Sequence, residues 1–130
     1  MDSEPSLKVA ARKLAGVLHR YAASRGWHYA PYGDFSRGDY YIDILANVEW
    51  SRFDVTLVAK ALGEHGSFDE FNKVQDWIEA NLKDDPALAE AVDIVVRSPK
   101  EYAEGRGSLG LGDMPIDDAL IMSAIPSGQA

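Results

Sequence analysis

The chain has 130 residues, of which 46% are hydrophobic and 26% charged, and 13 Lys and Arg against 21 Asp and Glu give a net charge of −8. This length is typical of one folded domain, and the absence of cysteine excludes disulfides, zinc–thiolate sites and thiol nucleophiles. The negative charge disfavours nucleic acid as the main partner, because a phosphate backbone would be repelled. No stretch is as apolar as a membrane-spanning helix, so we expect a cytoplasmic protein that does not enter a membrane.

The first predicted element is a helix over residues 6–25. Its hydrophobic positions recur every three or four residues, the spacing of one helical face. Ser6 is a candidate N-cap and Gly26 a candidate stop. His19 falls on the polar side of this helix, so we expect it to be exposed to solvent. The segment is basic, and the excess of negative charge therefore belongs to residues 26–130.

Two strands are predicted next, over residues 39–47 and 53–60. Hydrophobic and polar side chains alternate in both, and β-branched and aromatic residues are frequent. The short segment between them has the length of a hairpin loop. Residues 27–30 are a weaker candidate for an additional strand, ahead of a turn at 31–33.

A second amphipathic helix is predicted over residues 67–83. Ser67 and Glu70 have the spacing of a capping box, in which hydroxyl and carboxylate accept hydrogen bonds from free backbone N–H groups. Phe68 and Phe71 belong to its hydrophobic face, which we expect to be buried.

The chain then returns to short elements. Asp85-Pro86 can open one helical turn, and the hydrophobic run at 92–97 predicts a third strand. Ser98 and Glu101 form a second capping box with proline at the first helical position, which predicts a short helix ending near residue 104.

These elements divide the chain into a single α+β domain at residues 1–104, a glycine-rich linker at 105–112, and a C-terminal docking segment with its tail at 113–130. The last segment is too apolar for an ordinary free terminus. It has to be covered by its own sheet or by a second copy in a homodimer, and a short tether favours the intramolecular alternative.

The predicted fold class is α+β, with the element order α-(β)-β-β-α-β-α and a C-terminal apolar tail. A mainly antiparallel sheet of three to four strands is expected to be covered by the two amphipathic helices, because each helix has one apolar stripe to bury. The residues expected to be most deeply buried are Leu14, Leu18, Ile44, Val55, Leu57, Phe71, Trp77 and Val95.

The sequence contains no recognisable catalytic constellation. The three histidines are far apart, and no serine lies in a nucleophile-elbow motif. The Gly-x-Gly-x-x-Gly spacing at 105–110 follows a predicted helix, whereas a dinucleotide-binding loop follows a strand. We therefore expect no enzymatic activity, no cofactor and no metal site.

Two segments resemble the minimal nucleotidyltransferase family in its glycine-serine loop, its strand with paired aspartates and its third-strand region. The similar residues are 32–39, 41–44, 92–96, Pro99 and Glu101. The resemblance implies that Asp43 and Asp93 are the metal ligands of a magnesium-dependent transfer. Asp34 stands where the family has serine, and Tyr41 where it has the first aspartate. The alternative function is therefore a degenerate nucleotidyltransferase-like domain.

The order of hairpin, helix and strand over residues 53–102 is similar to BolA-like and type II KH-like domains. The metal-binding histidine of the first family and the Gly-x-x-Gly loop of the second have no counterpart in this sequence. This second alternative therefore implies a fold without the usual ligand residues, and neither iron–sulfur trafficking nor nucleic-acid binding follows from it.

In size, acidity and element order the chain is also similar to small acidic secretion chaperones, including Ala80-Asn81-Leu82 at the end of the second helix. In size and acidity it is similar to bacterial immunity proteins. Both groups are binding modules. We therefore predict a small acidic, non-enzymatic protein-binding module with an adaptor-like, chaperone-like or immunity-like role.

The predicted partner is a protein with a basic or amphipathic surface, because the excess negative charge attracts such a surface over a distance. Candidate contact residues lie on the polar side of the second helix and in the apolar tail. They are Asp69, Asp76, Glu79, Ile116, Leu120 and Ile121.

Overall fold

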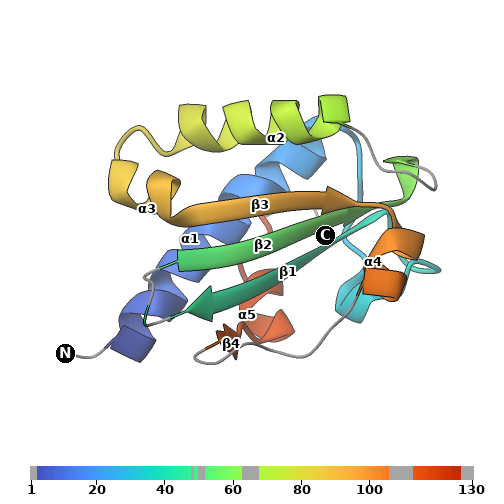
Figure 1. Ribbon diagram of the computed structural model, residues 1–130. Coiled ribbons are helices and arrows are strands. Elements are labelled where there is room, and N and C mark those ends of the chain that lie inside the picture. The colour runs from blue at the N-terminus through green and yellow to red at the C-terminus, as the bar shows by residue number, and fades with distance from the viewer. Residues whose placement is uncertain (1–2, 48, 50–51, 63–67, 106–112, 127–130) are drawn as a thin grey trace.

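The computed structural model describes residues 3–47, 49, 52–62, 68–105 and 113–126. Helices and strands alternate along the chain (Figure 1). In order they are α1 (Ser3–Ser24), the 3-10 turn η1 (Pro31–Gly33), β1 (Tyr40–Asn47), β2 (Arg52–Ala59), η2 (Lys60–Leu62), α2 (Phe68–Asn81), α3 (Pro86–Ala91), β3 (Val92–Arg97), α4 (Pro99–Gly105), β4 (Asp113–Pro115) and α5 (Asp118–Met122).

The fold is α+β, as predicted, but its sheet is mixed. The four strands lie in the order β3-β2-β1-β4. β1 runs antiparallel to β2 and β4, whereas β2 and β3 run parallel. The prediction of a mainly antiparallel sheet is therefore only partly right. The connection from β2 to β3 contains two helices, and such a crossover returns the chain in the same direction.

The fourth strand differs from the one that the sequence pattern indicated. Residues 27–30 contribute a single isolated bridge, between Tyr29 and Tyr40. The outer strand beside β1 is instead β4, from the C-terminal segment. A long-range pairing of this kind leaves no mark on the local pattern of either segment.

The first helix begins at Ser3, so Ser6 is not its N-cap as predicted, whereas the predicted end of the helix is confirmed in detail. Gly26 has a left-handed φ of +76°. Its N–H donates to the carbonyl of Ala23 at 3.0 Å, and the N–H of Trp27 donates to the carbonyl of Ala22 at 3.0 Å. This is the Schellman arrangement, in which a glycine terminates the helix.

The capping box before α4 is also confirmed. The N–H of Ser98 donates to Glu101 Oε1 at 2.9 Å, and the N–H of Glu101 donates to Ser98 Oγ at 3.1 Å. The other predicted capping box cannot be followed, because Ser67 lies outside the described residues.

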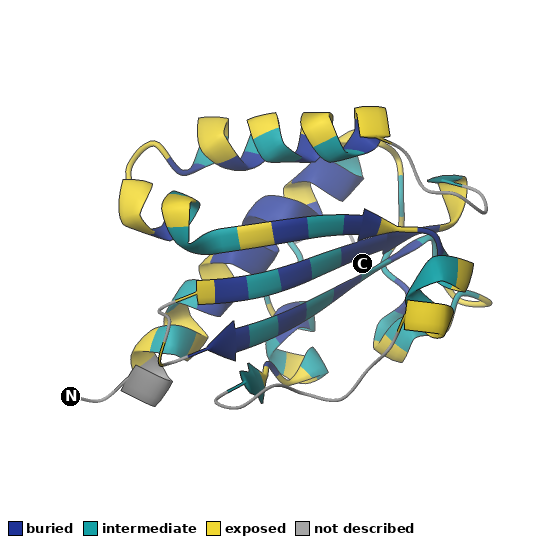
Figure 2. Cartoon of the chain, in the orientation of Figure 1, coloured by how far each residue is buried: buried dark blue, intermediate teal, exposed yellow. Residues whose placement is uncertain are grey.

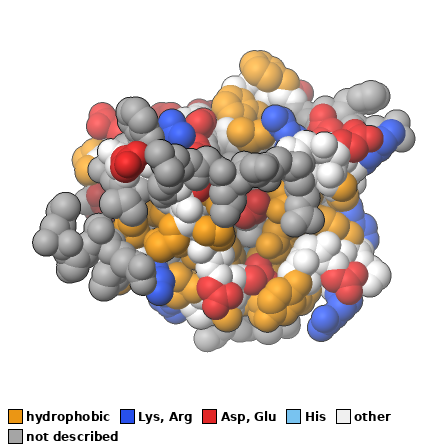
Figure 3. Space-filling view, turned by 60° about the horizontal axis from the view of Figure 1, so that its bottom comes forward, with side chains coloured by type: hydrophobic (Ala, Val, Ile, Leu, Met, Phe, Trp, Pro, Cys, Tyr) orange, Lys and Arg blue, Asp and Glu red, His pale blue; other side chains and the backbone are white. Residues whose placement is uncertain are grey.

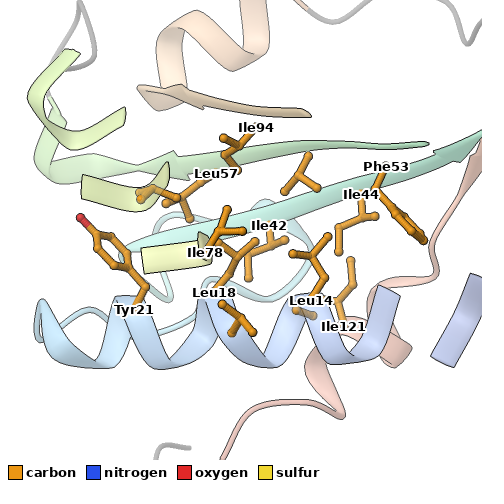
Figure 4. Packing of buried hydrophobic residues seen from close by; sticks show 14 of the residues in the cluster. Leu14, Leu18, Tyr21, Ile42, Ile44, Phe53, Leu57, Ile78, Ile94 and Ile121 are labelled. Carbon is orange, nitrogen blue, oxygen red and sulfur yellow. The ribbon is translucent and has the colours of Figure 1, made fainter. Parts of the chain in front are cut away.

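The core lies between one face of the sheet and the helices α1 and α2 (Figure 4). Along the strands, buried residues alternate with half-buried ones (Figure 2), as expected for a sheet with one covered face. Of the residues predicted to be most deeply buried, five are so: Leu14, Leu18, Ile44, Val55 and Leu57.

The other three, Phe71, Trp77 and Val95, are half-buried. Val95 alternates with the buried residues Ile94 and Val96 and therefore points to the face away from the helices. The indole of Trp77 packs at the rim of the core, where Nε1 donates to the carbonyl of Val17 at 2.9 Å. None of the helices within the described ranges is long and apolar enough to cross a membrane.

The C-terminal segment lies on the chain's own sheet and first helix. β4 pairs with β1, and Ile121 of α5 belongs to the same core cluster as α1. Residues 106–112 lie outside the described residues, so their interpretation as a linker stays a prediction.

The prediction that His19 is exposed is wrong, because α5 covers this part of α1 and leaves the side chain 1% exposed. Its Nε2 lies 2.8 Å from the carbonyl oxygen of Ile121, and Nδ1 lies 2.6 Å from the Tyr40 hydroxyl. Since a carbonyl can only accept, Nε2 donates, and Nδ1 of the neutral ring accepts from Tyr40. Burial lowers the pKa of His19, although the Ile121 carbonyl and the Asp118 carboxylate oppose this effect.

Candidate functional site

β3 is one edge of the sheet. It pairs with β2 on its inner side, and no backbone hydrogen bond from the other described residues reaches its outer side. Such an edge presents N–H and C=O groups that can pair with an added strand.

A groove of about 390 Å³ follows this edge. Residues 94–97 of β3 line it, together with Phe68 and Phe71 of α2 and Glu101 of α4. Because four consecutive residues of the strand contribute, the groove runs along the strand's edge as well as over its side chains. We call this surface the β3 groove.

The apolar wall of the β3 groove is formed by two phenylalanines. Their rings stack with centroids 6.2 Å apart, and Phe68 has 76% of its surface exposed. The sequence pattern assigned Phe68 to the buried face of its helix. Successive residues of a helix point about 100° apart, so Phe68 points about 80° away from Ile78, which lies at the centre of the buried face. This offset marks Phe68 as a residue at the boundary of that face.

An ion pair with α1 holds the N-terminal turn of α2 in place. The Glu70 carboxylate accepts hydrogen bonds from Arg25 Nε at 3.1 Å and Nη2 at 2.9 Å, and from the Tyr21 hydroxyl. Its side chain is only 5% exposed. Burial raises the pKa of Tyr21, and the neighbouring Glu70 carboxylate raises it further. The adjacent Phe68 and Phe71 are therefore presented from a fixed turn of helix.

Exposed carboxylates also lie on α2, the helix that carries the apolar wall. The predicted contact residues Asp69, Asp76 and Glu79 are all exposed. By helical geometry Glu79 points within about 20° of Phe68, and the other two within about 100°. Asp69 and Asp76, however, point about 160° and 140° away from Phe71. Asp76 lines a different hollow, beside Tyr21 and Trp77. Of the three carboxylates, Glu79 alone lies on the side of the apolar wall. Whether these carboxylates contact a partner stays a prediction.

The candidate contact residues of the tail face inward. Ile116 and Ile121 are 8% and 1% exposed, and Leu120 is half-buried against the core. These side chains therefore pack against the chain's own core, and we propose no partner contact through them.

The two aspartates of the alternative metal site are not brought together. The register places Asp43 of β1 opposite Thr56 of β2, and Asp93 of β3 opposite Asp54 of β2. Two strand spacings, about 10 Å, and an offset of two residues along the strands therefore separate the backbone positions of the two aspartates. Asp43 accepts a hydrogen bond from the Tyr102 hydroxyl at 2.9 Å. Within the described part of the chain no group of three or more possible ligands is arranged to hold a metal ion.

Comparisons of this chain with models of protein families, with curated proteins and with solved structures find no match. The function is therefore inferred from the chain's own residues.

Proposed function

We propose that this protein is a protein-binding module whose β3 groove receives an extended segment of a partner protein. The observation that carries this proposal is an open strand edge with an exposed aromatic wall beside it. An added strand would satisfy the edge's backbone groups. It would also cover the Phe68 ring, and full burial of such a side chain is worth about 1.5–3 kcal/mol.

The chemistry of the groove defines the segment that fits it. Alternate side chains of an added strand point to the same face, so every second residue of the segment should be apolar to contact Phe68 and Phe71. Basic residues should flank this apolar core, because Glu101 lines the groove, Glu79 is exposed on the same side of α2 as Phe68, and the whole chain carries −8. Attraction between these charges raises the association rate more than the final affinity.

The proposal is tested by selecting peptides from a random displayed library on the full chain. The peptides are about 12 residues long, a length that matches an extended segment along one strand edge. The dissociation constant of each selected peptide is then measured by fluorescence polarisation. Phe68→Asp should weaken binding at least about 10-fold, which corresponds to about 1.4 kcal/mol. Val9→Asp is the matched control, because it makes the same kind of change at a side chain that is 72% exposed on α1.

Two further measurements separate strand addition from adhesion to an exposed ring. Hydrogen exchange at residues 94–97 should slow when peptide binds, and the association rate should fall as salt increases. Selected peptides that bind Phe68→Asp as well as the wild type contradict the proposal. A peptide-free dimer, detected by sedimentation and lost in Phe68→Asp, also contradicts it, because a second copy would then occupy the edge.

A further inference from the structure

A second cavity, of about 230 Å³, is lined by residues of η1, the beginning of β1 and α4. The beginning of β1 and α4 lie at the same end of the sheet (Figure 1). Four aromatic side chains line it: Tyr32, Phe35, Tyr41 and Tyr102. Gly33, Pro99 and Ala103 complete the lining. We call it the aromatic cavity. Tyr41 projects from the face of the sheet away from α1 and α2. The cavity shares no lining residue with the β3 groove.

Fixed contacts hold the inner rings of the cavity. The ring centroid of Tyr41 lies 6.1 Å from that of Tyr102 and 5.9 Å from that of Tyr29. The Tyr102 hydroxyl is tied to Asp43. Two aromatic faces are therefore positioned before any ligand arrives.

Tyr32 stands at the mouth of the cavity in an unusual backbone conformation. Its φ of +55° is left-handed, a conformation that is unfavourable for a residue other than glycine. The Asp118 carboxylate holds it there by accepting a hydrogen bond from its N–H at 3.0 Å. The side chain nevertheless remains 71% exposed, so packing within the chain does not compensate for this unfavourable conformation.

Two carboxylates, those of Asp43 and Asp118, lie beside the cavity's rings. Burial raises the pKa of the Tyr41 hydroxyl, and the nearby carboxylates of Asp118 and Asp43 raise it further. On the side of the molecule with β4 and α5, carboxylates lie among hydrophobic side chains (Figure 3). A cation also lies at the cavity, because the Nζ of Lys60 donates to the backbone carbonyl of Phe35 at 3.1 Å. Aromatic faces are themselves electron-rich and attract cations.

We propose that the aromatic cavity binds an alkylated ammonium group. Such a group combines a positive charge, which the carboxylates and ring faces attract, with methyl groups that fill an apolar space. A phosphate-bearing ligand would meet the carboxylates, and a neutral ring would gain nothing from them. The group can belong to a free small molecule or to a methylated lysine of a protein.

The test titrates the full chain with choline and follows the tyrosine ring signals by NMR. The control ligand is 3,3-dimethylbutan-1-ol, which has the shape of choline without its charge. Choline should shift the signals of Tyr41 and Tyr102 saturably, and the neutral compound should bind at least about 10-fold more weakly. Equal binding of the two ligands, or no binding of any alkylated cation, overturns the proposal.

A variant identifies the site. Tyr32→Asn removes the ring at the mouth, and asparagine adopts the left-handed conformation more readily than tyrosine, so the fold should be retained. Choline affinity should fall at least about 5-fold, because cation–π contacts contribute about 0.5–2 kcal/mol each. Phe68→Leu, which removes an exposed ring from the β3 groove, is the matched control and should change nothing. Unchanged choline binding in Tyr32→Asn would show that choline does not bind in the aromatic cavity.

Peptides distinguish the two sources of the ligand. A peptide with trimethyllysine that binds more tightly than choline indicates a protein ligand, and the reverse order indicates a small molecule. Both results support the cation site. Since the test does not involve the β3 groove, failure of one proposal leaves the other standing.

Discussion

The ion pair between Arg25 and Glu70 should contribute measurably to stability, because its carboxylate is buried. Arg25→Met keeps an unbranched apolar side chain to pack against Trp27, whose ring centroid lies 5.3 Å from the guanidinium carbon. It removes both guanidinium hydrogen bonds from a carboxylate that is only 5% exposed. Breaking a fully buried pair costs about 3–5 kcal/mol, and the 38% exposure of Arg25 reduces this to about 2 kcal/mol.

Urea denaturation at neutral pH measures this loss. With a slope of about 2 kcal/mol per molar urea, the midpoint should fall by about 1 M. Lys13→Met is the matched control, because Lys13 pairs with Asp84 and Asp85 at 3.1 and 3.4 Å on the exposed surface, where ion pairs contribute little. Equal midpoint shifts in the two variants would refute the argument from burial.

Three further predictions concern the core and the backbone. Because burial lowers the pKa of His19 below 6.5, the unfolded chain takes up the proton first. The free energy of unfolding should therefore fall as pH drops below about 6.5, and urea titrations across this range should show a smaller slope in His19→Gln. Ile121→Ala should cost about 2–4 kcal/mol in the same assay, because the side chain is 1% exposed; an unchanged midpoint would show that α5 does not stabilise the domain. Gly38→Ala should destabilise the fold, since a Cβ there would lie 2.3 Å from the carbonyl oxygen of Tyr29. Gly16→Ala should stabilise α1 by about 0.5–1 kcal/mol, because the atom nearest to the new Cβ would be 3.7 Å away. The midpoint of thermal unfolding should therefore shift in opposite directions in the two glycine variants, and shifts in the same direction would contradict this comparison.

Features that depend on a few neighbouring residues were predictable from the sequence. The capping box of Ser98 and Glu101, the stop at Gly26 and the bounds of β3 all follow from side chains within five positions of one another. The exposure of the acidic residues on α2 followed in the same way from helical periodicity. Local hydrogen bonding and side-chain period determine such features, whatever the rest of the chain does.

The candidate sites could not be predicted, because each is assembled from distant segments. The β3 groove combines α2, β3 and α4, and the aromatic cavity combines η1, β1 and α4. β3 and α4 are neighbours in the chain, but α2 reaches the groove from a distant segment, and the parts of the aromatic cavity are likewise separated, so neither site has a sequence motif. Tyr41 and Tyr102, whose rings contact each other, are far apart in the chain.

The sequence by itself determined the positions of α1, β1, β2, α2, β3 and α4 and most of the apolar side of the longer elements. Only the tertiary structure decided which apolar sides are covered. His19 became buried because α5 returned to α1, and Phe68 stayed exposed because no described element lies over it. The parallel pairing of β3 and the use of residues 113–115 as the outer strand were decided in the same way. A periodic pattern records how much apolar surface a segment has, whereas burial depends on the shape and position of the surface that meets it.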